Sequence, residues 1–165
     1  MKIKCSYTEL VDAIRLRPHP KNPNKHPKEQ IDRLAELIAY QGQRSPVVVS
    51  SRSQCVVVGH GRLKAMLQLG WEKVAVDYQD FENDAQEYAH LTADNAINEW
   101  SNLDLAEINL GVMDFGPELN IEMLGLKNFT VDITEKIDLT FDDDDDEKES
   151  KRIECPNCGH QFEEE

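Results

Sequence analysis

The sequence predicts a small α/β (α+β) domain, followed by an acidic extension. A β-branched run at 55–58 ends abruptly at Gly59-His60-Gly61, and helix-forming residues begin at Arg62. This pattern is typical of a buried strand that turns directly into a helix. Apolar side chains at positions 31, 34, 35 and 38 follow the spacing of one helix face. After Trp100 the composition becomes acidic, which places the end of the compact domain near that residue.

The elements expected before the glycine turn are a strand, a loop and a helix. Residues 11–17 alternate as a strand does, with Ile14 among the apolar positions. The segment 18–27 contains four prolines, and proline disfavours both helix interiors and central strands, so we expect a surface loop there. Pro27 suits the first turn of a helix that reaches about Tyr40.

Capping and turn residues delimit the remaining elements. Asn83 is expected to cap a helix, with Gln86 in the capping-box position, and a turn is indicated around 92–95. Ser101-Asn102 is expected to cap a short helix, and Pro117 to start another. The other expected elements are a hairpin over 47–58 with its turn at 51–54, a helix over 62–69 and a strand over 73–78.

Charge divides the chain, whose formal net charge is −14. Residues 1–76 hold 13 Lys/Arg against 6 Asp/Glu, whereas residues 101–165 hold 5 against 19. The front can approach phosphates and the back repels them, so we expect no direct binding to duplex DNA by this chain alone. Four regions follow: a domain over 1–100, short helices over 101–129, an acidic flexible linker over 130–152 and a CxxC tail over 153–165.

Targeting and redox features predict a cytoplasmic protein. The sequence contains no run of apolar residues long enough to cross a membrane, and its start lacks the apolar core of a signal peptide. Its four cysteines are too few and too unevenly spaced for a disulfide framework, which fits a reducing compartment.

The glycine turn is the first candidate site. Gly59 and Gly61 permit close approach of a ligand, and a helix start presents unpaired N–H groups together with Arg62. This combination favours an anion such as phosphate, although two glycines also occur in plain strand-to-helix connections. His60 is a candidate general base or phosphate donor, or else a turn residue whose ring bonds the backbone.

Four motifs in order resemble the N-terminal domain of the ParB/sulfiredoxin superfamily, as found in bacteriophage and prophage proteins. They are Pro18-His-Pro-Lys-Asn-Pro-Asn24, the helix with Leu34-Ala-Glu-Leu-Ile38, the turn Gly59-His-Gly-Arg-Leu-Lys-Ala65 and Ala93-Asp-Asn95. The resemblance spans about residues 11–100. It implies a small mixed sheet and a nucleotide pocket for CTP or ATP with Mg²⁺.

The resemblance also implies site residues. Gly59, Gly61 and Arg62 would contact phosphates, Asp94-Asn95 would form the second nucleotide motif, and Asn22 and Lys25 would contribute from the first loop. Three positions depart from the family. His60 stands where sulfiredoxin has its catalytic cysteine, which excludes sulfinic-acid reduction. Asn24 and Asn98 stand where the CTP-binding relatives have arginines, which argues against tight triphosphate binding.

Three further sets of residues leave alternatives open. His19 and His26 face the same pocket or only shape the loop, and Asp94-Asn95 either holds a base, sugar or Mg²⁺ or caps or breaks a helix. Cys155 and Cys158 form a zinc half-site that needs His160, another cysteine or a second chain, or else belong to a metal-free tail.

The leading hypothesis is a nucleotide- or phosphate-binding protein that acts in DNA transactions of a phage or mobile element, with weak NTPase activity as an extension. The first alternative is a DNA nuclease that uses His60, Asp94 and a metal. The second is a non-enzymatic adaptor for a DNA methyltransferase or packaging enzyme, and the third is a kinase for a small hydroxyl substrate. The predicted partners are a nucleotide and a DNA-modifying or packaging protein, with homodimerisation left open.

Overall fold

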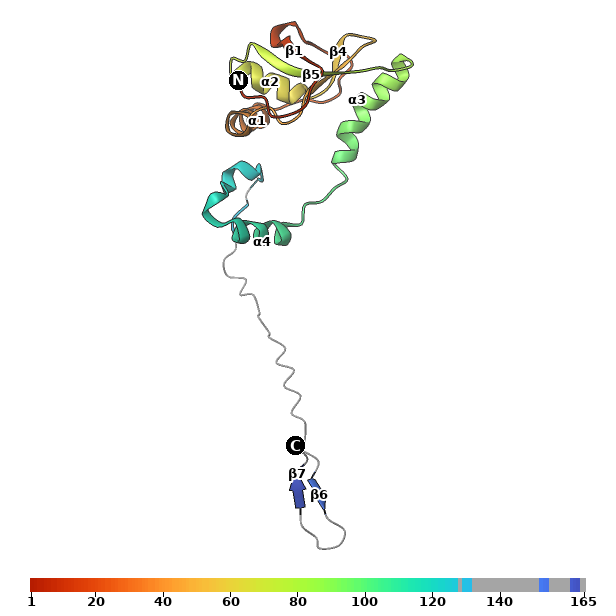
Figure 1. Cartoon of the computed structure of the whole chain (residues 1–165). Helices are drawn as coiled ribbons and strands as arrows, with labels where there is room; N and C mark the ends of the chain where they lie inside the picture. The colour runs from red at the N-terminus through yellow and green to blue at the C-terminus, as the bar shows by residue number, and fades with distance from the viewer. Residues whose placement is uncertain (128, 132–151, 155–160, 164–165) are drawn as a thin grey trace. The chain divides into compact units, whose positions relative to one another are not determined.

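The computed structural model describes residues 1–127, 129–131, 152–154 and 161–163 (Figure 1). The chain divides into two compact units, Met1–Thr130 and Val131–Glu165. In the second unit, β6 (Arg152–Glu154) pairs antiparallel with β7 (Gln161–Glu163). Most of the predicted acidic linker and both cysteines of the predicted zinc half-site lie outside the described residues.

A five-stranded mixed sheet forms the centre of the first unit, with the strand order β1-β5-β3-β4-β2. The β1–β5 and β3–β4 pairs are antiparallel, whereas β3–β5 and β2–β4 are parallel. The predicted hairpin and its turn at 51–54 are confirmed. The strands are β1 (Glu9–Asp12), β2 (Arg17–Pro18), β3 (Val47–Ser50), β4 (Cys55–Val58) and β5 (Lys73–Gln79).

Two helices, α1 (Lys28–Gln41) and α2 (His60–Gln68), pack against each other beside the sheet (Figure 1). The predicted apolar face of α1 is confirmed, because Ile31, Ala35 and Ile38 are all buried in the core. Met66 of α2 and the central valines of the sheet complete this core. Burial of such side chains is the main stabilising contribution to a domain of this size.

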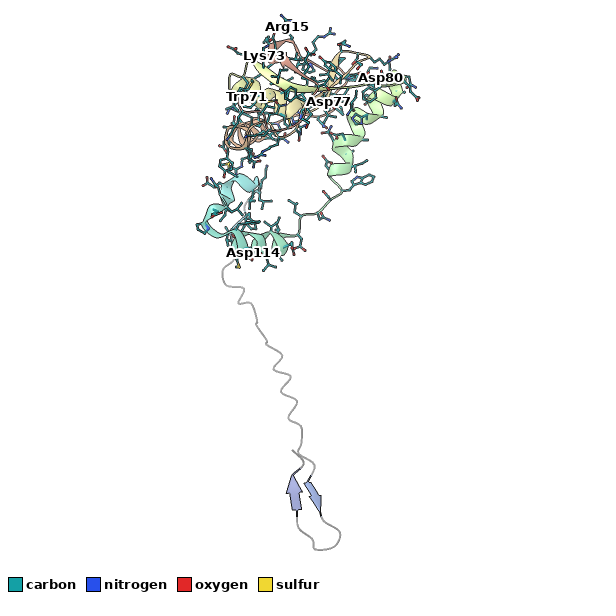
Figure 2. All side chains as sticks on the ribbon, viewed as in Figure 1. Arg15, Trp71, Lys73, Asp77, Asp80 and Asp114 are labelled. Carbon is teal, nitrogen blue, oxygen red and sulfur yellow. The ribbon has the colours of Figure 1, made fainter. Side chains whose placement is uncertain are left out.

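The remaining helices follow β5. Asp77 lies near the end of β5, and Asp80 follows on the way to α3 (Asp84–Asn98) (Figure 2). Asn83 caps α3 as predicted, since its side chain accepts the N–H of Gln86 at 2.9 Å. Beyond α3 come α4 (Leu105–Phe115) and two 3₁₀ turns, η2 (Gly116–Glu118) and η3 (Ile121–Leu124). Within the described part of the chain, none of the helices combines the length and the apolar character that a membrane crossing requires.

Two predicted elements are wrong. The strand expected over 11–17 is interrupted, because Ala13–Arg15 (η1) forms a 3₁₀ turn between β1 and β2. Ala13 enters the core and Ile14 is left 85% exposed, so alternation in the sequence did not reflect a continuous strand. The turn expected around 92–95 is also wrong, because α3 runs through these residues without a break.

The two short helices after Trp100 also differ from prediction. Asp104, rather than Ser101-Asn102, caps α4 by accepting the N–H groups of Ala106 and Glu107. A carboxylate at this position satisfies two donors and complements the helix dipole. The helix expected from Pro117 is instead the pair η2 and η3, and Gly125 follows η3 in a left-handed conformation.

Parallel pairing of β2 with β4 positions the proline-rich loop. Arg17 pairs with Cys55 and Pro18 with Val56, and both strands run in the same direction. The chain therefore leaves β2 toward the same end of the sheet at which β4 leads into the glycine turn. Two motifs about 40 residues apart in the sequence are brought together in this way, as the contact between His19 and His60 confirms.

Candidate functional site

The turn from β4 into α2 is built on a left-handed glycine. Gly59 has φ +93° and ψ 24° and precedes α2, which begins at His60, two residues before the expected start. The first helical hydrogen bond runs from the N–H of Leu63 to the carbonyl of Gly59 at 2.9 Å. The N–H groups of residues 60–62 therefore have no partner within the helix, and such groups favour an anion.

Both glycines are required by close contacts. A Cβ on Gly59 would lie 3.1 Å from Arg62 Nη2, so the absence of a side chain lets the guanidinium lie over the turn. A Cβ on Gly61 would lie 3.1 Å from Leu34 Cδ1 and 3.2 Å from His26 Nδ1. Gly61 therefore allows α2 to approach both α1 and the end of the proline-rich loop, and His26 lies beside the turn.

Arg62 carries a buried donor without a partner. Its Nη2 lies 3.4 Å from the carbonyl of Pro46, whereas its Nε is buried and has no hydrogen-bond partner among the residues that the structure describes. Burial lowers the pKa of the guanidinium, and the negative charges of Asp94 and Cys5 act in the opposite direction. A guanidinium remains charged even when its pKa is lowered, so a cation with unused hydrogen-bonding capacity lies at the turn.

His60 is buried, with 7% of its surface exposed. Its Nε2 accepts the N–H of His19 at 3.3 Å, and its ring also hydrogen-bonds the backbone of Val56. Burial, followed by the nearby His26, His19 and Lys64, lowers the pKa of His60 to about 4. The ring is therefore neutral at physiological pH, and both of its nitrogens have protein partners.

The proline-rich loop is folded around His19. The ring Nδ1 of His19 accepts the N–H of Lys21 at 3.2 Å, and its carbonyl accepts the N–H of Asn22 at 3.1 Å. The side chain of Asn22 in turn accepts the N–H of Asn24 at 3.1 Å. Asn22 is thus a turn-forming residue, whereas Lys25 is exposed and lines an open cavity of about 1240 Å³ along α1.

The two residues of the predicted second nucleotide motif have different environments. The negative charge of Asp94 on α3 raises the pKa of Arg62, against the larger lowering by burial. Asn95, in contrast, donates its side-chain amide to the carbonyl of Leu91 on its own helix at 3.1 Å. Asp94 therefore acts on Arg62 through its charge, whereas the amide of Asn95 bonds its own helix.

The comparisons with known proteins agree with this arrangement of turn, loop and helix. The sequence model of the ParB N-terminal domain matches residues 4–95, which is more than half of the chain. The chain belongs to the ParB N-terminal domain family. The exclusion of sulfiredoxin-type chemistry by His60 stays a prediction. None of the curated proteins searched matches the chain.

One solved ParB structure shows the same fold, and two others align less well. The C-terminally truncated chromosome-partitioning protein ParB of Caulobacter crescentus, complexed with CTP-γ-S, aligns with a TM-score of 0.60 at 18% identity, over 72% of this chain and 71% of that one. The same protein complexed to the centromeric parS site gives 0.46 at 15% identity, over 67% and 58%. A Pnob8-like ParB-N domain gives 0.45 at 21% identity, over 68% and 47%. The agreement in fold rests on the first of these.

Sequence reasoning missed Glu87, a buried carboxylate of this ParB N-terminal domain. Glu87 lies on α3 with 2% of its surface exposed. Its Oε2 accepts the hydroxyl of Ser50 at 2.9 Å, its Oε1 accepts the hydroxyl of Ser53, and His19 Nε2 lies 3.4 Å from Oε1. The signal in the sequence was its spacing of four residues from Leu91, which is also buried.

Metal ligation receives no support from the described residues, where no group of three or more His, Cys, Asp or Glu side chains is arranged to hold an ion. Asp94 is the carboxylate whose charge acts on Arg62. Magnesium commonly binds through one or two carboxylates together with substrate phosphates. A magnesium ion that arrives with a nucleotide and the nuclease hypothesis both stay predictions.

Proposed function

We propose that this ParB N-terminal domain binds a nucleoside triphosphate at the turn 59–62, with Arg62 as the main phosphate contact. The observation that supports this most directly is the buried Nε of Arg62, which has no partner among the described residues. A buried donor without a partner is energetically costly, about 1–3 kcal/mol for an uncompensated group. A phosphate oxygen would satisfy it and would neutralise the guanidinium in a charge-assisted hydrogen bond.

The surrounding charges favour the same ligand. The unpaired N–H groups at the start of α2 point outward from the positive end of the helix dipole. Lys64 lies near His60 on the same helix and adds positive charge. Asp94 is the counter-charge of Arg62, and with a bound magnesium ion it would face the phosphates without repelling them. Magnesium supplies charge neutralisation of the phosphates when it is bound.

His60 acts in this proposal as a positioning residue. Its Nε2 accepts a hydrogen bond from the loop, and its ring bonds the backbone of β4. A neutral ring with both nitrogens engaged fixes the turn against the proline-rich loop and has no lone pair left for a water molecule. The proposal is therefore nucleotide binding. Hydrolysis, a phage origin and a DNA-modifying or packaging partner stay predictions.

Titration calorimetry of the full chain with CTP and with ATP, each with Mg²⁺, tests the proposal. CTP is the first choice because the matched Caulobacter ParB was crystallised with CTP-γ-S. We expect Arg62→Ala to weaken binding by about a hundredfold, since it removes a charge-assisted contact worth about 1.5–3 kcal/mol. Arg15→Ala is the matched control, because Arg15 projects from η1 with 77% of its side chain exposed (Figure 2).

Two results would overturn the proposal. The first is no heat of binding for either nucleotide at millimolar concentration. The second is equal affinity of the native chain and Arg62→Ala, because a ligand that does not contact Arg62 does not occupy the turn.

A further inference from the structure

We propose that Glu87 positions the proline-rich loop against the glycine turn and so sets the affinity of the nucleotide site. This inference rests on the proposed function, because it concerns the same pocket. Glu87 itself belongs neither to the turn nor to the loop. It acts through His19, a residue of the loop whose backbone N–H bonds His60 in the turn and whose ring lies beside Glu87.

Glu87 connects three segments that are distant in the sequence. The hydroxyls of Ser50 and Ser53 come from the end of β3 and the following turn, and His19 comes from the proline-rich loop. The carboxylate lies on α3 and is almost fully buried. A buried carboxylate is tolerated only when hydrogen bonds compensate for its lost hydration. Glu87 therefore holds these three segments in one fixed arrangement.

The hydrogen bonds of His19 fix its ring. Its Nδ1 accepts the N–H of Lys21, so the proton of the neutral ring resides on Nε2, which lies 3.4 Å from the carboxylate of Glu87. A carboxylate partner of this kind fixes both the tautomer and the orientation of an imidazole. Glu87 thus determines which nitrogen of His19 accepts the Lys21 N–H, and with it the fold of the loop.

The backbone of His19 carries this constraint to the site. Its N–H donates to His60 Nε2, and its carbonyl accepts the N–H of Asn22. The backbone pairing that ties the start of the loop to the sheet is short, because β2 is only two residues long. Without Glu87 the ring of His19 loses its carboxylate partner, and the loop samples several conformations instead of one. Fixing that loop again on binding costs conformational entropy, which lowers the affinity for a nucleotide.

Three variants of the full chain test the inference. Glu87→Ala removes the acceptor, whereas Glu87→Gln keeps an amide oxygen for His19 and offers N–H donors to the serine oxygens. Glu82→Ala is the control, because Glu82 is an exposed carboxylate just before α3. Amide hydrogen exchange of His19, Lys21 and Asn22 reports the loop, relative to the amides of β5. The ¹⁵N chemical shifts of the His19 ring report its tautomer, and calorimetry with CTP and Mg²⁺ reports the affinity.

We expect Glu87→Ala to reduce the protection of the three loop amides about tenfold, because these amides exchange through local opening of the loop. The β5 amides exchange through global unfolding and report the loss of overall stability separately. Nucleotide affinity falls about tenfold in the same variant. Glu87→Gln restores the loop protection and the affinity to within about threefold, and Glu82→Ala leaves both unchanged. The His19 ring shifts from the Nε2–H tautomer to a mixture in Glu87→Ala. A role limited to global stability would lower the protection of the β5 amides and leave the loop amides unchanged, and that result overturns the inference.

The outcomes separate this inference from the proposed function. If the native chain binds no nucleotide, the proposed function fails, and the exchange and tautomer readouts decide whether Glu87 positions the loop. If the native chain binds and Glu87→Ala binds equally well, the inference fails while the proposed function stands.

Discussion

Arg62 and Glu87 are two buried charged groups with opposite surroundings. The Nε of Arg62 is buried and has no hydrogen-bond partner among the described residues, whereas the carboxylate of Glu87 accepts two hydroxyls and lies beside the ring of His19. A buried charge without enough partners destabilises the free protein and is satisfied by a ligand. A buried charge with all its partners stabilises one conformation. The comparison therefore supports the proposed binding role of Arg62 and the proposed positioning role of Glu87.

The largest difference between the two residues is expected in the free energy of unfolding, when each charged side chain is replaced by an apolar one. Glu87→Ala should lower the free energy of unfolding by about 3 kcal/mol, because it leaves buried donors without an acceptor. Arg62→Met should leave it unchanged or raise it by about 1 kcal/mol, because a desolvated cation is removed. Urea denaturation of the full chain without nucleotide measures both. Equal destabilisation by the two substitutions would contradict the comparison.

His60 provides a pH-dependent version of the same comparison. Its pKa in the folded protein is about 4, below the ordinary 6.5, because burial disfavours the charged ring. Between these values the unfolded chain binds a proton that the folded chain does not. The contribution of His60 to stability is therefore fully present above pH 6.5 and is lost as the pH is lowered. We expect a loss of about 2 kcal/mol at pH 5 relative to pH 8.

His60→Gln is the control for this pH dependence. Glutamine can accept the N–H of His19 and does not titrate, so this variant should lose the contribution of His60 and keep that of the carboxylates. Urea denaturation at pH 8 and pH 5 measures the difference between the two proteins. An identical pH dependence in both would show that the ring of His60 is not held in its neutral form.

Gly59→Ala should produce a smaller effect. An alanine at φ +93° is strained, and its Cβ would lie 3.1 Å from Arg62 Nη2. We expect a loss of stability of about 1 kcal/mol, the usual cost of a left-handed conformation for an L-residue. Because the Arg62 guanidinium must also move, the affinity for the nucleotide should fall together with the stability. Gly70→Ala is the matched control, because Gly70 has φ +71° but no atom within 4 Å of the added Cβ. If Gly59→Ala bound the nucleotide with native affinity, the proposed contact between Arg62 and the phosphates would be contradicted.

The smallest effect is expected at the exposed ion pair between Arg52 and Asp84. The two side chains lie 2.5 Å apart near the cavity beside Glu87, but 43% and 85% of their surfaces are exposed. Exposed pairs contribute little, so Arg52→Ala should leave the midpoint of urea unfolding unchanged. A loss comparable to that of Glu87→Ala would mean that the exposed charges, rather than the buried carboxylate, hold the loop in place.

The sequence predicted those parts of the fold that depend on local pattern. The buried face of α1, the β3–β4 hairpin and the cap at Asn83 follow from spacing and residue type within a few positions. The residues of the glycine turn indicated an anion site, and the family resemblance added the nucleotide. Ile14 and the turn expected around 92–95 were wrong, because local alternation and polar residues do not reveal which way the chain turns or how far a helix continues.

The environments of the site residues depend on distant contacts, which one sequence does not disclose. Glu87 receives its partners from positions 34, 37 and 68 residues earlier in the chain. The surroundings of Arg62 include the carbonyl of Pro46 and the charge of Asp94 on α3. Residue type identified Arg62 as a candidate, but only the fold distinguishes an exposed arginine from one with an unused buried donor.

The two-residue strand β2 has a consequence for protease sensitivity. Its pairing with β4 involves only Arg17 and Pro18, so the edge of the sheet at this point can open far more easily than the domain can unfold. Lys21 and Lys25, both exposed, lie in the loop that follows. Brief digestion with trypsin should therefore cut the free chain first after these two lysines. Resistance of these two bonds would then serve as a simple gel-based measure of how fully the site is occupied.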